Sequence, residues 1–183
     1  MLIKDSISIQ IKEPLISSNF DPGFSREIMS RHGGEKLSLC YQCGVCAGSC
    51  PSGKLTDMFK IRNLIHMAQL GMRDEVLSSD AIWLCSSCYV CQERCPQGIE
   101  IADLMLAIRN IAIIEGYGAQ GTIAQGVALI KDGRLVKISR LTEKRRANYG
   151  LQPTPSTGVE AIKTIAKATG FDKILERFKG GSK

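Results

Sequence analysis

The stretch that decides the fold reads Cys40-Tyr41-Gln42-Cys43-Gly44-Val45-Cys46-Ala47-Gly48-Ser49-Cys50-Pro51. It recurs as Cys85-Ser86-Ser87-Cys88-Tyr89-Val90-Cys91-Gln92-Glu93-Arg94-Cys95-Pro96. Both copies follow the spacing C-x2-C-x2-C-x3-C-P, and together they use all eight cysteines of the chain. We call them the first and second cysteine runs. We expect the other segments of the chain to position the two runs, to shield them from water and to connect them.

Cysteines at this spacing can reach the corners of one compact metal cluster. The pattern is typical of [4Fe–4S] clusters, in which the first three cysteines of a run bind one cluster and the fourth binds the neighbouring cluster. On this rule the ligands divide into a first site, made of Cys40, Cys43, Cys46 and Cys95, and a second site, made of Cys85, Cys88, Cys91 and Cys50. The sequence therefore predicts two neighbouring clusters joined by crossed ligation.

Other uses of the cysteines fit the sequence less well. Four disulfides would need an oxidising compartment, and the thiols lie close together within each run rather than in separable pairs. Structural zinc sites usually present separated C-x2-C pairs. The only histidines, His32 and His66, are not needed as ligands, because eight thiolates already complete two clusters.

Charge is spread unevenly along the chain. The net charge is +6, but residues 131–183 hold 13 Lys and Arg against 5 Asp and Glu, which leaves −2 for the first 130 residues. The basic run 144–146 has no accompanying nucleic-acid-binding motif, so a solvated face or an acidic protein partner is favoured. Residues 1–10 show no secretory signal, and no apolar stretch approaches the roughly 18 residues of a membrane span. We expect a cytoplasmic protein without nucleic-acid or membrane partners.

Hydrophobic spacing predicts a mainly α-helical chain. Alternating isoleucines in 6–12 favour a short N-terminal strand, and 24–32 favours a short helix. Between the runs, Ile61, Ile65 and Ala68 recur at helical spacing after an N-cap at Thr56 or Asp57, and Gly71 ends that helix. We also expect helices over 74–78, 101–115, 123–130, 135–141 and 159–178, the one near 159 starting from a capping box at Ser156 or Thr157 with Glu160.

These elements suggest three parts: an N-terminal strand or arm over 1–35, a two-cluster domain over 36–118, and a basic helical docking extension over 119–183. The chain contains no GxGxxG after a strand, no Walker loop and no nucleophile elbow. We therefore expect an electron-transfer subunit of an oxidoreductase complex, without a catalytic residue of its own. The apolar and aromatic neighbours of the cysteines are expected to form a dry shell around the clusters, namely Leu39, Tyr41, Val45, Leu84, Tyr89 and Val90.

Two such runs joined by a helical insert resemble the α-helical ferredoxin domain, over about residues 36–118. The phrase Leu37-Ser38-Leu39-Cys40-Tyr41-Gln42-Cys43-Gly44 and the insert Arg62-Asn63-Leu64-Ile65-His66-Met67-Ala68-Gln69-Leu70-Gly71 are similar to the C-subunit family of soluble heterodisulfide reductases. The resemblance implies that electrons arrive from a heterodisulfide reductase subunit that carries flavin and iron–sulfur clusters. It implies that they leave to a catalytic subunit whose CCG-held clusters reduce the coenzyme M–coenzyme B heterodisulfide in methanogenesis. It also implies a larger complex with a hydrogenase or formate dehydrogenase.

Two other functions remain open at this point. The chain could be the iron–sulfur subunit of another dehydrogenase, of the fumarate, lactate or glycolate type, in which case a different flavoprotein would accompany it. It could also be a ferredoxin that acts alone. The long extensions on both sides of the cysteine runs disfavour a ferredoxin that acts alone.

Overall fold

The computed structural model describes residues 20–136, 138–154 and 158–180. Within these ranges the chain is helical and contains no strand, so the mainly α expectation is confirmed there. The strand expected over 6–12 lies outside the described residues. The helices are α1 (Pro22–Met29), α2 (Val45–Ser49), α3 (Pro51–Leu55), α4 (Ile61–Leu70), α5 (Arg73–Leu77), α6 (Val90–Glu93), α7 (Ile101–Glu115), α8 (Gln120–Asp132), α9 (Arg140–Asn148), α10 (Val159–Thr169) and α11 (Phe171–Glu176).

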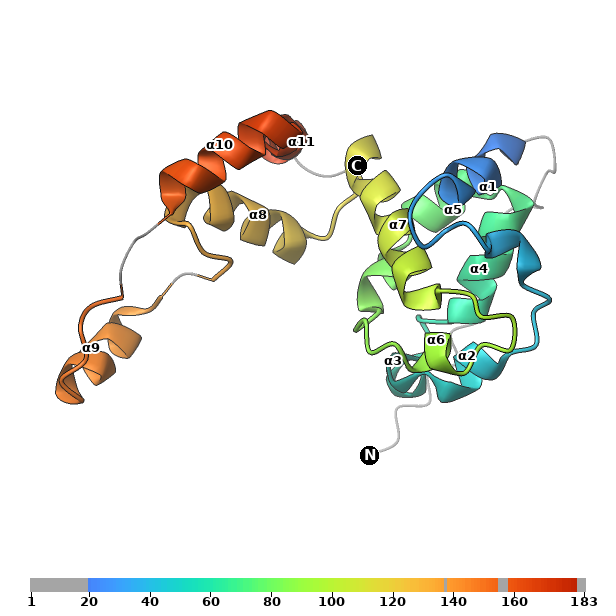
Figure 1. Cartoon of the computed structure of the whole chain (residues 1–183), viewed down its shortest axis with the longest axis horizontal. Helices are drawn as coiled ribbons and strands as arrows, with labels where there is room; N and C mark the ends of the chain where they lie inside the picture. Colours follow the sequence, from blue (N-terminus) through green and yellow to red (C-terminus); the bar gives the residue numbers. More distant parts are fainter. Residues whose placement is uncertain (1–19, 137, 155–157, 181–183) are drawn as a thin grey trace.

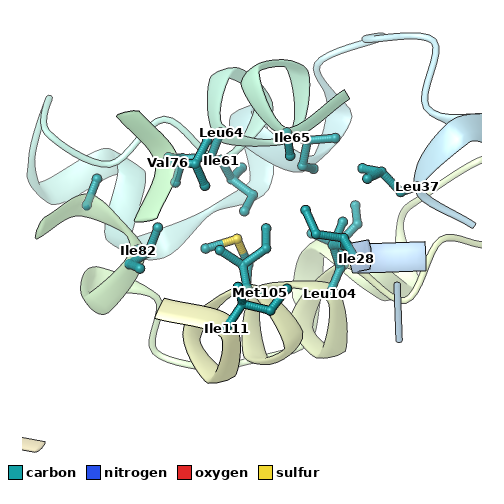
Figure 2. Packing of buried hydrophobic residues seen from close by; sticks show 14 of the residues in the cluster. Ile28, Leu37, Ile61, Leu64, Ile65, Val76, Ile82, Leu104, Met105 and Ile111 are labelled. Atoms are coloured by element: carbon teal, nitrogen blue, oxygen red, sulfur yellow. The ribbon is translucent and has the colours of Figure 1, made fainter. Parts of the chain in front are cut away.

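One aliphatic core joins α1, α4, α5 and α7, and the short helices α2, α3 and α6 gather at one end of this body (Figure 1). Figure 2 shows Leu104, Met105 and Ile111 of α7 pointing toward Ile61, Leu64 and Ile65 of α4. Phe24 and Ile28 of α1 are fully buried in the same core. The segment expected to be an N-terminal arm thus contributes a packed helix.

The ends of α4 test the expected helix signals. Gly71 is the C-cap, with φ +80°, as predicted. The predicted N-cap is wrong: the helix begins at Ile61, and Lys60 caps it without a side-chain hydrogen bond. Thr56 Oγ1 instead accepts from the Met58 N–H at 3.2 Å in the preceding turn. The start of α10 differs similarly, because Gly158 is its N-cap; Ser156 and Thr157 lie outside the described residues.

A single arginine connects three helices of the core. Arg73, at the start of α5, pairs with Asp21, with Glu27 of α1 at 2.8 Å and with Glu115 of α7. Its guanidinium also lies 5.1 Å from the centre of the Phe24 ring. Burial opposes the charged form, but the hydrogen bonds to Glu115 and Glu27 outweigh it and raise the pKa of Arg73. Arg73 therefore holds α1, α5 and α7 together while staying charged.

Replacing Arg73 by alanine is expected to lower the free energy of unfolding by about 1–3 kcal/mol, because three partly shielded carboxylates would lose their common partner. Urea unfolding followed by circular dichroism measures the change. The control is Arg31→Ala, which removes only an exposed pair with Glu27 at 3.4 Å and should cost less than about 0.5 kcal/mol. Equal losses in the two variants would contradict this role for Arg73.

The C-terminal helices form a second group. Helix α8 packs against α10 and α11. Ala166 of α10, Leu175 of α11 and Phe178, which follows α11, are buried. This group meets the end of α7, since Arg177 donates to the Ile114 carbonyl at 2.5 Å and the Phe178 ring reaches Gly118. Helix α9 stands apart from both groups (Figure 1). In the described ranges no helix has the length and apolar character needed to cross a membrane.

Candidate iron–sulfur site

The two cysteine runs have the same backbone shape. The residue before the second cysteine has a positive φ in each run, +64° at Gln42 and +52° at Ser87. The residue after the second cysteine does so too, with φ +85° at Gly44 and +63° at Tyr89. Each loop then enters a short helix, α2 or α6, that carries the third cysteine. The sequence repeat is therefore a structural repeat, and Tyr89 holds a conformation that favours glycine.

The first cavity lies beside α2. Its lining includes Cys40, Cys43 and Cys46 of the first run together with Cys95 of the second. The apolar side chains of Ile99 and Ile101, both nearly fully buried, close its inner wall. All four cysteines that the sequence assigned to the first site thus meet at one cavity.

The second cavity repeats this arrangement with the runs exchanged. Cys85, Cys88 and Cys91 of the second run line it together with Cys50 of the first. Its apolar wall includes the buried side chains of Phe59, Ile61 and Ala102. The fourth cysteine of each run therefore lies at the cavity of the other run.

This exchange follows from the packing of the two short helices. Helices α2 and α6 lie against each other, and Arg94 donates to Ser49 Oγ at 3.2 Å between them. Cys50 and Cys95 follow immediately on these paired helices, each before a proline. Pro51 begins α3 and Pro96 begins a turn, so the chain changes direction directly after each crossing cysteine.

The donor groups in both cavities are suited to iron–sulfur clusters. All eight cysteines are free thiols, and thiolate sulfur is the ligand that such clusters take. Sulfur atoms also receive hydrogen bonds: Gly53 N–H donates to Cys50 Sγ and Gln42 Nε2 donates to Cys40 Sγ, both at 3.3 Å. In the described part of the chain no three Cys, His, Asp or Glu side chains converge closely enough for a single metal ion. In an iron–sulfur cluster each iron takes its own cysteine.

Burial affects the third cysteine of each run most strongly. It raises the pKa of the Cys46 thiol, and it raises the pKa of Cys91 to about 11. Without metal these two groups are neutral thiols at pH 7. Metal binding must therefore displace their protons, which makes cluster assembly easier at higher pH.

The expected dry shell differs from the observed one. Leu39, Tyr41, Val45, Leu84 and Tyr89 are all exposed in this chain. The cavities are instead closed by buried residues after the runs, such as Phe59 and Ile99. Sequence adjacency misled the prediction, because a residue next to a cysteine in the chain need not point into the cavity. The result is an exposed apolar rim around both cavities.

Gln69, in the insert between the two runs, hydrogen-bonds to the backbone of the first run. Gln69 of α4 donates through Nε2 to the carbonyls of Leu37 and Cys40, at 3.1 and 2.9 Å. Its Oε1 accepts from Gln42 Nε2 at 3.2 Å, and the same Gln42 amide reaches the Cys40 sulfur. Sequence analysis missed Gln69, because a glutamine on a helix gives no signal of its own.

A residue of α7 holds the second run in the same way. Arg109 donates through Nε to the Ile82 carbonyl at 2.7 Å and through Nη2 to the Cys85 carbonyl at 2.6 Å. The guanidinium lies 5.9 Å from the centre of the Trp83 ring. The sequence did offer a signal here, since Arg109 is the only Lys or Arg in the apolar helix α7.

Comparison with known proteins agrees with this geometry. Residues 36–99 match the family described as "4Fe-4S dicluster domain". That range contains both runs and all eight cysteines. The match supports [4Fe–4S] clusters as the cofactors, and a dicluster domain fits the two cavities.

Relatives extend the similarity over most of the chain. The C-subunit of the "H(2):CoB-CoM heterodisulfide,ferredoxin reductase" of Methanothermobacter thermautotrophicus is 40% identical, over 91% of this chain and 93% of its own length. The iron–sulfur C-subunit of the "CoB--CoM heterodisulfide reductase" of Methanopyrus kandleri is 40% identical, over 87% and 83%. The C2-subunit of a Methanococcus maripaludis "H(2)/formate:CoB-CoM heterodisulfide,ferredoxin reductase" is 36% identical, over 87% and 92%. The chain therefore belongs to the C-subunit family of heterodisulfide reductases, iron–sulfur electron-transfer subunits of an oxidoreductase complex.

Proposed function

We propose that this chain passes electrons between two partner subunits through two [4Fe–4S] clusters with crossed ligation. Cys40, Cys43, Cys46 and Cys95 would hold one cluster, and Cys85, Cys88, Cys91 and Cys50 the other. The observation that carries the proposal is that these two sets line two separate cavities. When bound, such clusters supply one-electron oxidation and reduction.

The residues of the chain provide the surroundings that this task needs. The inner walls of the cavities exclude water, because they are formed by the buried side chains of Phe59, Ile61, Ile99 and Ile101. Electrostatic interactions inside the cavities are therefore weakly screened. The packed helices α2 and α6 keep the two cavities adjacent. No catalytic residue is proposed, because the chain's contribution is to hold, insulate and space the clusters.

The exposed apolar rim supports docking of partners close to the clusters. Tyr41 is 59% exposed and Val45 41% at the first cavity, and Tyr89 is 44% exposed at the second. Apolar side chains gathered at one place on a surface mark interaction sites. A partner seated there would shield the clusters and shorten the path of the electron.

The names of the relatives imply partner subunits, and the proposed partners follow the family resemblance. The heterodisulfide reductase subunit that carries flavin and clusters would deliver electrons. The subunit with CCG-held clusters would accept them and reduce the coenzyme M–coenzyme B heterodisulfide. A hydrogenase or formate dehydrogenase would join the larger complex. In the three-part division at residues 35 and 118, the basic extension 119–183 would dock to an acidic partner surface, since its net charge is +8 and that of the remaining chain is −2.

Anaerobic affinity purification of the tagged chain from its native cells tests the proposal. A CCG-containing subunit and a flavin-containing subunit should co-purify with it. Val45→Asp, at the exposed rim, should weaken this association, and Leu70→Asp, exposed at the end of α4 opposite the cavity-lining Ile61, should weaken it less. Co-purification with a succinate-type flavoprotein and no CCG subunit would favour the alternative, an electron-transfer subunit of another dehydrogenase.

A further inference from the structure

The two cysteine runs are held at equivalent backbone atoms. Cys40 and Cys85 open the runs, and Leu37 and Ile82 each lie three residues earlier. Gln69 bonds the carbonyls of Leu37 and Cys40, and Arg109 bonds those of Ile82 and Cys85. A side chain from a core helix therefore clamps the same two carbonyls in each half of the repeat.

The two clamps differ in charge. Gln69 is a neutral amide, and its oxygen is satisfied by Gln42. Arg109 is a cation that is only partly exposed, packed between the Trp83 ring and the backbone of the second run. Its two short bonds use the rigid fork of the guanidinium, which fixes both carbonyls at once. Arg109 therefore places a positive charge next to the backbone of the second run, whereas Gln69 places none next to the first run.

The other cations near the cavities are more open to water. Arg62 lines the first cavity and Lys36 donates to the Gly98 carbonyl at 3.1 Å, but both are exposed. At the second site Asp103 accepts from the exposed Tyr89 hydroxyl at 3.2 Å. Water and salt screen exposed charges, whereas a shielded charge acts at close range. Asp103 is only partly exposed as well, but it is an anion. Arg109 is thus the shielded cation at the second site, where it bonds to the Cys85 carbonyl.

We propose that Arg109 positions the second cysteine run and raises the reduction potential of the cluster at the second site. A cluster becomes one unit more negative when it accepts an electron, so a nearby cation favours the reduced form. Gln69 fixes the first run without this contribution. The inference rests on the proposed two-cluster assignment and gives the two sites different electronic surroundings despite their equal ligands.

Arg109→Gln tests the inference, because it places at the second run the side chain that the first run uses. Potentiometric titration of the anaerobic protein, followed by electron paramagnetic resonance, measures each cluster separately. The potential of the second cluster should shift to a lower value, and that of the first should not change. An unchanged second potential, or an equal shift in both clusters, would overturn the proposal.

Arg109→Lys separates charge from positioning. It keeps the cation but loses the fork, so the second potential should stay near that of the unmodified chain while the thermal unfolding midpoint falls. A potential as low as in Arg109→Gln would overturn the electrostatic role, and this variant decides the matter if Arg109→Gln does not retain its second cluster. Arg62→Gln is the control, with a smaller shift confined to the first cluster. If the unmodified chain holds only about four irons, the two-cluster assignment fails instead.

Discussion

Cys95→Ser is expected to damage the cluster at the first site, although Cys95 belongs to the second run. Cys95 lines the cavity of Cys40, Cys43 and Cys46, so its loss would leave three thiolates there. Iron per chain should fall from about eight atoms toward about four, with the second site intact. Iron analysis and electron paramagnetic resonance of the anaerobically purified variant measure this.

Two matched variants identify which site has been damaged. Cys43 and Cys88 are the exposed second cysteines of the two runs, so Cys43→Ser reports loss at the first site and Cys88→Ser loss at the second. The spectrum of Cys95→Ser should match that of Cys43→Ser. Cys50→Ser should match Cys88→Ser. If each crossing cysteine instead matched the variant of its own run, ligation would be uncrossed.

Gly71→Ala is expected to destabilise the core by about 3 kcal/mol or more. Gly71 has φ +80°, and an added Cβ would lie 2.3 Å from the Asp21 carbonyl oxygen. The two backbones cannot separate freely, because the Asp21 N–H donates to the Gly71 carbonyl at 2.7 Å. A left-handed conformation costs a non-glycine residue about 1–2 kcal/mol, and overpacking adds about 1–3 kcal/mol. The midpoint of urea unfolding measures the loss.

Substitutions at two other glycines separate the conformational cost from the steric cost. Gly170 has φ +73° with open space where a Cβ would lie, so Gly170→Ala should cost only the conformational part, about 1–2 kcal/mol. Gly121 lies within α8 with nothing within 4 Å, and its replacement by alanine should be neutral or stabilise by up to about 1 kcal/mol. A Gly71→Ala protein as stable as Gly170→Ala would show that the close approach to Asp21 is easily relieved.

The parts of the fold that depend on periodic hydrophobic side chains could be predicted from the sequence. Helix α7 and the Gly71 end of α4 appear where the spacing placed them. The start of α4 could not be predicted, because Thr56 offered a good N-cap signal that the chain uses in a turn. Tertiary packing of Ile61 decides where that helix begins.

The candidate site also has features that could be predicted from the sequence and features that could not. The ligation rule known for this cysteine spacing grouped the thiols in the same two sets that line the cavities. It could not predict that Tyr41 and Val45 face outward, because a residue next to a cysteine in the chain need not point into the cavity. The roles of Gln69 and Arg109 were not predicted either, since their carbonyl partners lie 24 to 32 residues away in sequence. The lone cation in the apolar helix α7 marks Arg109 as unusual, but it does not identify the carbonyls that Arg109 binds.

Iron and acid-labile sulfide analysis of the anaerobically purified, unmodified chain tests the central claim most directly. Two crossed [4Fe–4S] clusters require about eight irons and about eight sulfides per chain. The reduced protein should also show interacting paramagnetic centres, because the adjacent helices α2 and α6 keep the two cavities close together. A chain that holds about four irons and shows one isolated centre would contradict the account.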